Sequence, residues 1–247
     1  EVSAQEQSAA PAGGHSQIVV VVKASPNAEM ETTLAMEFPR LAAELKKAAK
    51  GKAEHSGAVP FGDVYVRLPH DDGTYVLAGD GKLYHERTGE ARRISSRAEQ
   101  ELRRVAEQLR RVHYGEPLPW KEAKKLVPKK GIITVVDLET GLSFKAQRRA
   151  GKHHADVQPL TAQDSAVMKQ IYRGTWSWDR KAILVKADGR VLAASMNGMP
   201  HGGDGIPGNK FAGHFCIHFL DSTTHRSKKV DPDHQLMVWK ASGQLDL

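Results

Sequence analysis

The feature that most restricts how this chain folds is a strictly alternating segment, residues 213–220, with the sequence GHFCIHFL. Side chains of a β-strand point to opposite faces with a period of two. Three apolar side chains therefore share one face, which we expect to lie in the core: Phe215, Ile217 and Phe219. The other face presents two imidazoles and a thiol: His214, Cys216 and His218. The pattern predicts a strand with one buried face and one polar, reactive face.

The thiol on this strand is the single cysteine of a 247-residue chain, so no disulfide can form within it. Histidines gather in the same half of the sequence, at positions 153, 154, 201, 214, 218, 225 and 234. A nearby imidazolium favours the thiolate form of cysteine. We therefore expect Cys216 to ionise more easily than a free cysteine. The alternative is a structural cysteine with two incidental histidine neighbours.

A glycine- and proline-rich segment, residues 197–209 (NGMPHGGDGIPGN), precedes this strand and predicts a loop. His201 lies within it and is followed directly by Gly202 and Gly203. Glycines beside a functional group allow the backbone of a substrate to approach closely. The loop is therefore a candidate part of a binding site, or else a long surface connection.

The whole chain predicts a two-domain α+β protein. Its expected parts are a disordered tail (1–16), an N-terminal α+β accessory domain (17–113), a basic proline-rich linker (114–130) and a β-rich, catalytic-like domain (131–247). Within them we expect strands at 17–23, 132–137, 142–147, 181–185 and 191–196, helices at 31–50, 162–172 and 233–241, and a loop at 153–156. Asp231 is expected to cap the last helix, with Pro232 in its first turn. Trp176 and Trp178 are expected to pack in the core.

Composition narrows the class of partner. Hydrophobic residues make up 40% and charged residues 26% of the chain, as in ordinary globular proteins. The longest apolar run, residues 18–22, is far shorter than the roughly 20 residues of a membrane span. A net charge of +7 favours an anionic partner, such as a cell-wall polymer. The low aromatic content, 6%, and the lack of a zinc-finger or RNA-recognition signature argue against specific nucleic-acid binding.

The first residues, 1–14, are small and polar, as in the segment that follows a removed signal peptide. We therefore expect a secreted or cell-envelope protein. In such an oxidising location an unpaired cysteine needs a reason, and a catalytic role would supply one.

The pair His201-Gly202, a glycine-rich gap, and Cys216 fifteen positions after the histidine resemble the L,D-transpeptidases of bacterial cell walls. That family has a His-Gly pair followed by a Ser-His-Gly-Cys-Ile-Arg-like segment, and the hairpin expected over 132–147 is similar to its first strands. The resemblance covers about residues 131–240. Two positions depart from the family pattern. Phe215 replaces a glycine of the oxyanion site, and His218 replaces an arginine that binds a substrate carboxylate.

The resemblance implies a cysteine acyl-transferase that needs no cofactor and acts on peptidoglycan stem peptides. Cys216 would be the nucleophile and His201 the base, held by the backbone around Gly202, with His214 lining the site. The family forms a thioester and passes the acyl group to an amine or to water. The residues expected on the substrate side are His218, Gly203, Asn197, Asn209 and His225.

Two other functions stay open from the residues themselves. A zinc-dependent cell-wall peptide hydrolase would draw its ligands from the histidine cluster: His154, Asp156, His201, His214 and His218. A non-catalytic cell-wall-binding protein would use the histidines and the basic segment as contact residues. The two classes of enzyme differ in whether the thiol or a metal ion activates the attacking group.

Overall fold

The computed structural model describes residues 17–37, 39–51, 54–55, 57–68, 73–225 and 227–244. These residues form two compact units. One contains the described residues up to Val22 together with Thr32–Leu109, and the other contains Lys23–Glu31 and the chain from Arg110 onward. The predicted α+β class is confirmed. The tail predicted over residues 1–16 lies outside the described residues.

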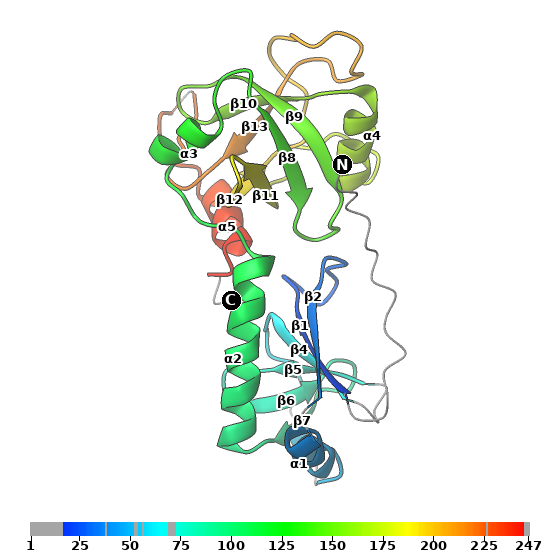
Figure 1. Ribbon diagram of the computed structural model, residues 1–247. Coiled ribbons are helices and arrows are strands. Elements are labelled where there is room, and N and C mark those ends of the chain that lie inside the picture. Colours follow the sequence, from blue (N-terminus) through cyan, green and yellow to red (C-terminus); the bar gives the residue numbers. More distant parts are fainter. Residues whose placement is uncertain are drawn as a thin grey trace. The chain divides into compact units, whose positions relative to one another are not determined.

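The first unit is built on an antiparallel sheet (Figure 1). Within the described residues this sheet has seven strands, in the order β2-β1-β4-β5-β6-β7-β3. The elements are β1 (Gln17–Val22), β2 (Thr32–Glu37), α1 (Pro39–Ala49), β3 (Glu54–His55), β4 (Val64–Arg67), β5 (Thr74–Leu77), β6 (Lys82–His85), β7 (Glu90–Arg93) and α2 (Ser96–His113). Helix α2 buries Leu102, Val105 and Leu109. Arg103 ties the helix to the end of β5 by donating to the carbonyl of Ala78 at 2.7 Å.

The helix predicted over residues 31–50 is wrong in its first part. Thr32–Glu37 forms the edge strand β2, which pairs along its whole length with β1. The helix α1 begins only at Pro39, where the first turn tolerates a residue without an N–H donor. Local helix propensity is a weak preference, and the pairing offered by the β-branched strand β1 overrides it.

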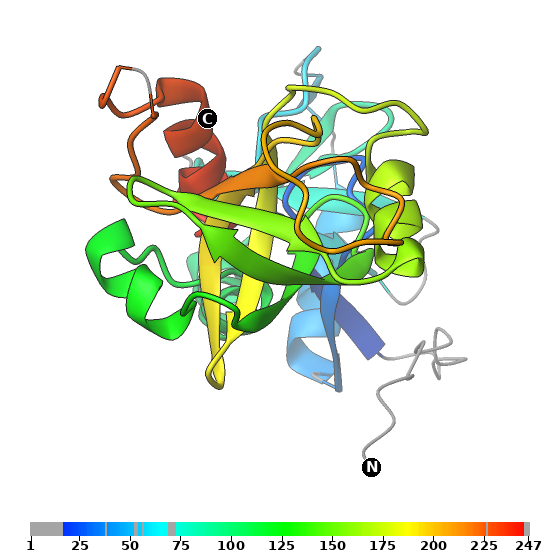
Figure 2. The ribbon, with the colours of Figure 1, turned by 90° about the horizontal axis from the view of Figure 1, so that it is seen from above.

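The second unit is a closed antiparallel barrel with helices outside it (Figure 2). In the described part of the chain its strands follow the order β10-β13-β12-β11-β8-β9. Its elements are α3 (Trp120–Leu126), β8 (Ile132–Asp137), β9 (Ser143–Ala150), β10 (Ala155–Pro159), α4 (Ala162–Ile171), β11 (Lys181–Ala187), β12 (Arg190–Met196), β13 (Phe215–His218) and α5 (Pro232–Ala241). The expected start of α5 is confirmed, because Asp231 accepts hydrogen bonds from the N–H groups of Asp233 and His234.

The side chains of residues 215–219 alternate between the interior of the barrel and its outer face. Phe215, Ile217 and Phe219 are fully buried in the apolar cluster of this unit, as the alternating pattern predicts. The neighbouring strands contribute Ala155 and Met196 to the same cluster. Because side chains alternate, the residues between them face the outside of the barrel.

The segment 114–130, expected as a basic proline-rich linker, contributes buried side chains to the barrel. The side chains of Trp120, Ala123 and Val127 are buried in the core cluster of the barrel. The indole of Trp120 stacks on Phe219 at 5.6 Å between ring centroids. Its backbone N–H donates to the carbonyl of Leu220 at 2.7 Å. The chain passes from the first unit to the second between Leu109 and Arg110.

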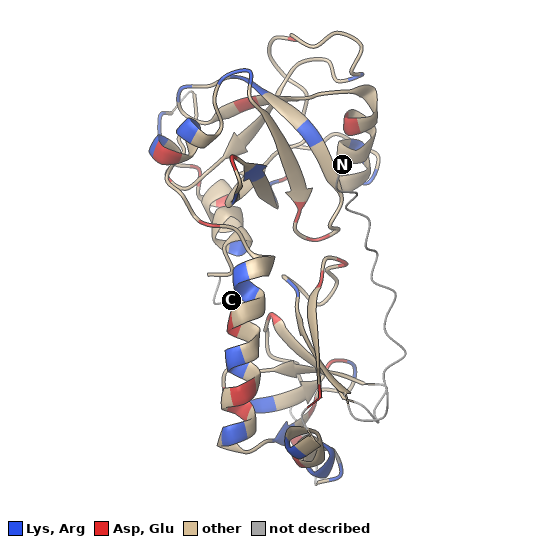
Figure 3. Ribbon diagram, in the orientation of Figure 1, with Lys and Arg blue, Asp and Glu red and all other residues tan. Residues whose placement is uncertain are grey.

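The basic residues expected to attract an anionic polymer are interspersed with acidic ones along α2 (Figure 3). Arg103 pairs with Glu99 at 2.8 Å, and Arg97 lies 3.6 Å from Glu101. Part of the positive charge of α2 is therefore compensated locally. No helix in the described ranges combines the length and the apolar character needed to cross a membrane.

Candidate active site

Cys216 lies at the centre of a row of three polar residues on neighbouring strands. Asp156 of β10 is its direct partner in the antiparallel register on one side. On the other side, the backbone N–H of Asn197, just past β12, donates to the carbonyl of Cys216 at 3.3 Å. The loop predicted over residues 153–156 is therefore wrong at its end, since β10 begins at Ala155. This strand brings a carboxylate next to the thiol.

His201 contacts the thiol directly. Its Nε2 atom lies 3.3 Å from the Sγ atom of Cys216, and its Nδ1 atom lies 2.8 Å from the carbonyl oxygen of Met199. A carbonyl oxygen only accepts hydrogen bonds, so Nδ1 carries the hydrogen and Nε2 presents its lone pair to the thiol. The ring of Trp178 flanks His201 at 5.0 Å between centroids. Trp178 is half-exposed instead of packed in the core as expected.

A short antiparallel bridge places His201 against the strand that carries Cys216. The backbones of His201 and His214 exchange two hydrogen bonds, of 3.0 and 2.8 Å. A Cβ atom on Gly213 would lie 2.5 Å from the carbonyl oxygen of His201, and one on Gly202 would meet the ring of His214. Both glycines have positive φ, 128° and 66°. The two glycines therefore permit the close approach that the bridge requires.

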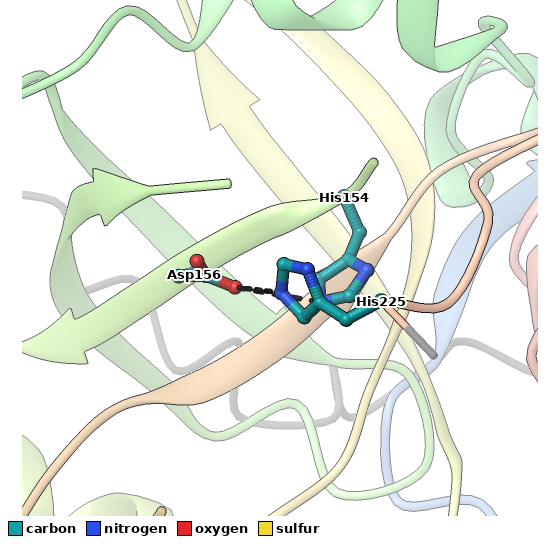
Figure 4. Close-up of side chains that lie close together, drawn as sticks. All are labelled: His154, Asp156 and His225. Atoms are coloured by element: carbon teal, nitrogen blue, oxygen red, sulfur yellow. Dashed lines mark hydrogen bonds and ion pairs between the residues drawn. The ribbon is translucent and has the colours of Figure 1, made fainter. Parts of the chain in front are cut away.

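Imidazoles surround the carboxylate of Asp156. Its Oδ1 atom lies 3.2 Å from Nε2 of His225, 3.3 Å from Nε2 of His154 and 4.0 Å from Nε2 of His214. Figure 4 shows His154 and His225 converging on this carboxylate. His154 is buried, whereas the side chain of His225 is 51% exposed. The cluster therefore reaches from the barrel wall to solvent.

His154 is held by a backbone carbonyl and begins a stack of three rings. Its Nδ1 atom donates to the carbonyl oxygen of Thr223 at 2.8 Å, because a carbonyl can only accept. The ring of His154 stacks on that of His218 at 4.3 Å, and His218 stacks on His234 of α5 at 3.8 Å. His234 ends the stack with a 2.8 Å contact between its Nδ1 atom and the hydroxyl of Ser195.

This stack encloses His218, which was expected on the substrate side. The residue lies on the predicted polar face of β13, but its side chain is buried between two other imidazoles. Burial lowers the pKa of His218 far below its usual value, so the ring is neutral. A neutral, enclosed imidazole is a poor partner for a carboxylate.

The charges at the site favour an ionised thiol. Burial alone raises the pKa of Cys216, but the interactions with His154 and His201 outweigh it and hold the pKa below its ordinary value. The hydrogen bond with Cys216 raises the pKa of His201. Burial opposes ionisation of Asp156, yet His154 and His225 lower its pKa to about 2. The pKa of His154 rises to about 10 because its contacts with Asp156 and Cys216 exceed the cost of burial.

Of the remaining residues expected on the substrate side, Asn209 and Gly203 have structural partners, whereas the side-chain oxygen of Asn197 has none among the described residues. The side chain of Asn209 is buried and anchors the loop, donating to the carbonyl of Pro159 at 2.8 Å and accepting from the N–H of Phe211 at 3.0 Å. The carbonyl of Gly203 lies 3.4 Å from Nδ1 of His214 and so orients that ring. Asn197 is buried beside Cys216, and its Oδ1 atom has no hydrogen-bond partner among the described residues.

Of the five zinc ligands proposed from sequence, only His154 and Asp156 belong to a cluster of candidate ligand atoms among the described residues. His154 and Asp156 lie together with His225, their candidate ligand atoms all within 4.8 Å of one another. His201 belongs to the thiol, and His218 is enclosed in the stack. The sequence placed His225 on the substrate side and took Asp156 for a loop residue. Only the alternating run Ala-Asp-Val beside a histidine pair hinted at a strand there.

Comparison of the chain with protein-family models, with curated proteins and with solved structures found no match. The chemistry of the site therefore rests on its own geometry.

Proposed function

We propose that the barrel is a cysteine acyl-transferase of the cell envelope, acting on peptidoglycan stem peptides through a thioester. The observation that carries this proposal is the contact between the Sγ atom of Cys216 and the Nε2 atom of His201, at 3.3 Å. The carbonyl of Met199 orients the histidine. The site therefore combines a nucleophile, a base and a group that orients the base. This is the general arrangement of an activated thiol.

The geometry supports the following sequence of steps. His201 accepts the thiol proton at Nε2, and the thiolate attacks the carbonyl carbon of the substrate amide. The C–N bond then breaks, and His201 returns the proton to the departing amine. An incoming amine or water molecule loses its proton to the same nitrogen as it attacks the thioester, which releases the thiol of Cys216. His201 thus acts alternately as base and acid.

The substrate class comes from the resemblance of residues 131–240 to the L,D-transpeptidases. The departure at Phe215 leaves the polar face open, because that side chain is buried in the barrel interior. The departure at His218 removes the family's carboxylate-binding charge. Among the described histidines around Cys216, His225 is the one with more than a third of its side chain in solvent. Trp178 offers an apolar wall beside His201.

Intact-mass spectrometry after exposure to a stem tetrapeptide or to a carbapenem tests the proposal. The wild-type protein is expected to gain one acyl adduct on Cys216, in buffer containing EDTA. Cys216→Ala should gain none. His201→Ala should react about 10²- to 10⁴-fold more slowly, because the base is lost while the nucleophile remains. His85→Ala, in the other unit, is the matched histidine control and should react like wild type.

Three results would contradict the proposal. An adduct on Cys216→Ala would place the nucleophile elsewhere. An unchanged rate for His201→Ala would remove the base. Turnover of wall peptides that disappears with EDTA would instead favour a zinc-dependent hydrolase.

A further inference from the structure

Two distances within the cluster of His154, Asp156 and His225 fit a tetrahedral metal site. Zinc binds nitrogen and carboxylate oxygen at about 2.0–2.2 Å, so two ligand atoms of a tetrahedral site lie about 3.3 Å apart. The Oδ1 atom of Asp156 lies 3.3 Å from Nε2 of His154 and 3.2 Å from Nε2 of His225. Both measured edges therefore match the spacing that zinc imposes on its ligands.

The orientation of His154 also supports a metal site. Its side chain is almost fully buried, and its Nε2 atom has no hydrogen-bond partner among the described residues, although the carboxylate lies at ion-pair distance. Its Nδ1 atom donates to the carbonyl of Thr223. A backbone carbonyl on the far nitrogen is the usual outer support of a zinc-bound histidine, because it fixes the tautomer and the ring orientation. Nε2 is thus aimed into the cluster, toward the carboxylate of Asp156.

We propose that His154, Asp156 and His225 form a binding site for a divalent transition-metal ion, of which Zn²⁺ is the best fit. Two imidazoles and one carboxylate are a ligand set typical of zinc sites with an exchangeable fourth position. The half-exposed ring of His225 gives the ion a path from solvent.

Because this site lies next to Cys216, an ion bound there is expected to change the reactivity of the thiol. Asp156 is the register partner of Cys216 on the adjacent strand, and His154 contacts both residues. An ion at this point takes His154 and Asp156 away from the thiol and offers the sulfur a fourth coordination position. Bound zinc should therefore slow attack by Cys216. Only this regulatory consequence rests on the proposed function, whereas the metal site itself does not.

Two measurements on the full chain, first stripped with EDTA and then desalted, test the inference. Zn²⁺ is titrated in competition with a coloured chelator, and alkylation of Cys216 by iodoacetamide is followed by intact mass with and without Zn²⁺. The wild-type protein should bind one ion per chain, and Zn²⁺ should slow its alkylation. In His225→Ala the affinity should fall about tenfold or more, and the slowing should disappear. This variant loses a half-exposed ring, so its fold should be retained.

His153→Gln is the matched control, because His153 is next to a ligand in sequence but does not belong to the cluster. It should bind Zn²⁺ like wild type, while Asp156→Asn should weaken binding as His225→Ala does. The inference is overturned if wild type takes up no stoichiometric zinc, or if His225→Ala binds as tightly. It is also overturned if Zn²⁺ slows alkylation equally in His225→Ala, because the ion would then act on the thiol alone. Neither readout uses a wall peptide, so failure of the proposed acyl transfer would leave both unchanged.

Discussion

The imidazoles of this site lie only a few ångströms apart, yet their pKa values differ widely. His154 lies beside the carboxylate of Asp156, and its pKa rises to about 10. The next rings in the stack, His218 and His234, are buried, and neither forms an ion pair with a carboxylate among the described residues. Burial lowers the pKa of His234 to about 3 and that of His218 further. The single carboxylate therefore localises the positive charge next to Cys216.

The buried stack predicts a pH dependence of stability that His218→Phe should reduce. In the unfolded chain a histidine has a pKa near 6.5, whereas folded His218 stays neutral well below that pH. The unfolded state therefore binds more protons as the pH falls. The stability contributed by His218 is complete above about pH 6.5 and is lost below it, at about 1.4 kcal/mol per pH unit. Urea unfolding of wild type and His218→Phe at several pH values between about 7 and 5 measures the difference.

Phenylalanine keeps an aromatic ring in the stack but cannot be protonated. His153, which is only partly buried, serves as the comparison when changed to Phe. Its pKa is also lowered, but without the deep burial of His218, so this change should alter the slope less. Equal slopes for wild type and His218→Phe would show that His218 takes up its proton in the folded state, which contradicts its burial.

At the scale of elements, the bridge between His201 and His214 sets the distance between base and nucleophile. It joins the glycine-rich loop to β13 by two backbone hydrogen bonds. Gly213 is essential to it for two reasons, a φ of 128° and a neighbouring carbonyl that leaves no room for a Cβ atom. Composition alone predicted a loop at this point, and the bridge makes that loop a positioning element.

Gly213→Ala should therefore disturb the alignment of His201 with Cys216. A displacement of about 1 Å at a reacting group can cost about 100-fold in rate, and we expect acylation to fall by about that factor. Acylation measured by intact mass, together with circular dichroism to confirm folding, provides the test.

Gly208→Ala is the control in the same loop. Gly208 also has a positive φ, 81°, but no heavy atom lies within 4 Å of a Cβ atom built there. It should lose about 1–2 kcal/mol of stability from backbone strain and keep the wild-type acylation rate. If both variants lose the same large fraction of the acylation rate, backbone strain rather than loss of the bridge explains the loss.

At the scale of the whole molecule, the segment 114–130 belongs to the barrel. Arg148 of β9 donates to the carbonyls of Val127 at 2.7 Å and Lys124 at 3.2 Å, and its guanidinium lies 4.7 Å from the ring of Trp120. These bonds satisfy the end of α3, a short helix with little stability of its own. A segment held in this way opens only when part of the barrel opens.

Native-state digestion with trypsin should therefore be slow at Lys121–Lys130, in spite of the many lysines there. Trp120→Ala removes a buried ring at a cost of about 3–5 kcal/mol, and cutting in this segment should become at least about tenfold faster. Trp178→Ala removes a half-exposed tryptophan and is the matched control, with little effect expected on this segment. Early cutting of the wild-type protein between Lys121 and Lys130 would instead support an exposed linker.

The sequence by itself determined the features that depend on residues within a few positions of each other. The alternation of residues 213–220 fixed the two faces of β13, because the period of a strand is local. Asp231 and Pro232 fixed the start of α5, and the hairpin of β8 and β9 followed from its turn. His201 and Cys216 could also be paired in advance, through the resemblance carried by their spacing.

Only the tertiary structure decided what surrounds the thiol. Asp156 reaches Cys216 through the register of β10 against β13, across a sequence separation of sixty residues. His225 arrives from the loop after β13, and the stack of His154, His218 and His234 joins three separate elements. The sequence around Asp156 favours no partner strand. Closure of the barrel determines the partner strand of β10, because the burial of many apolar side chains outweighs the preferences of any single short segment.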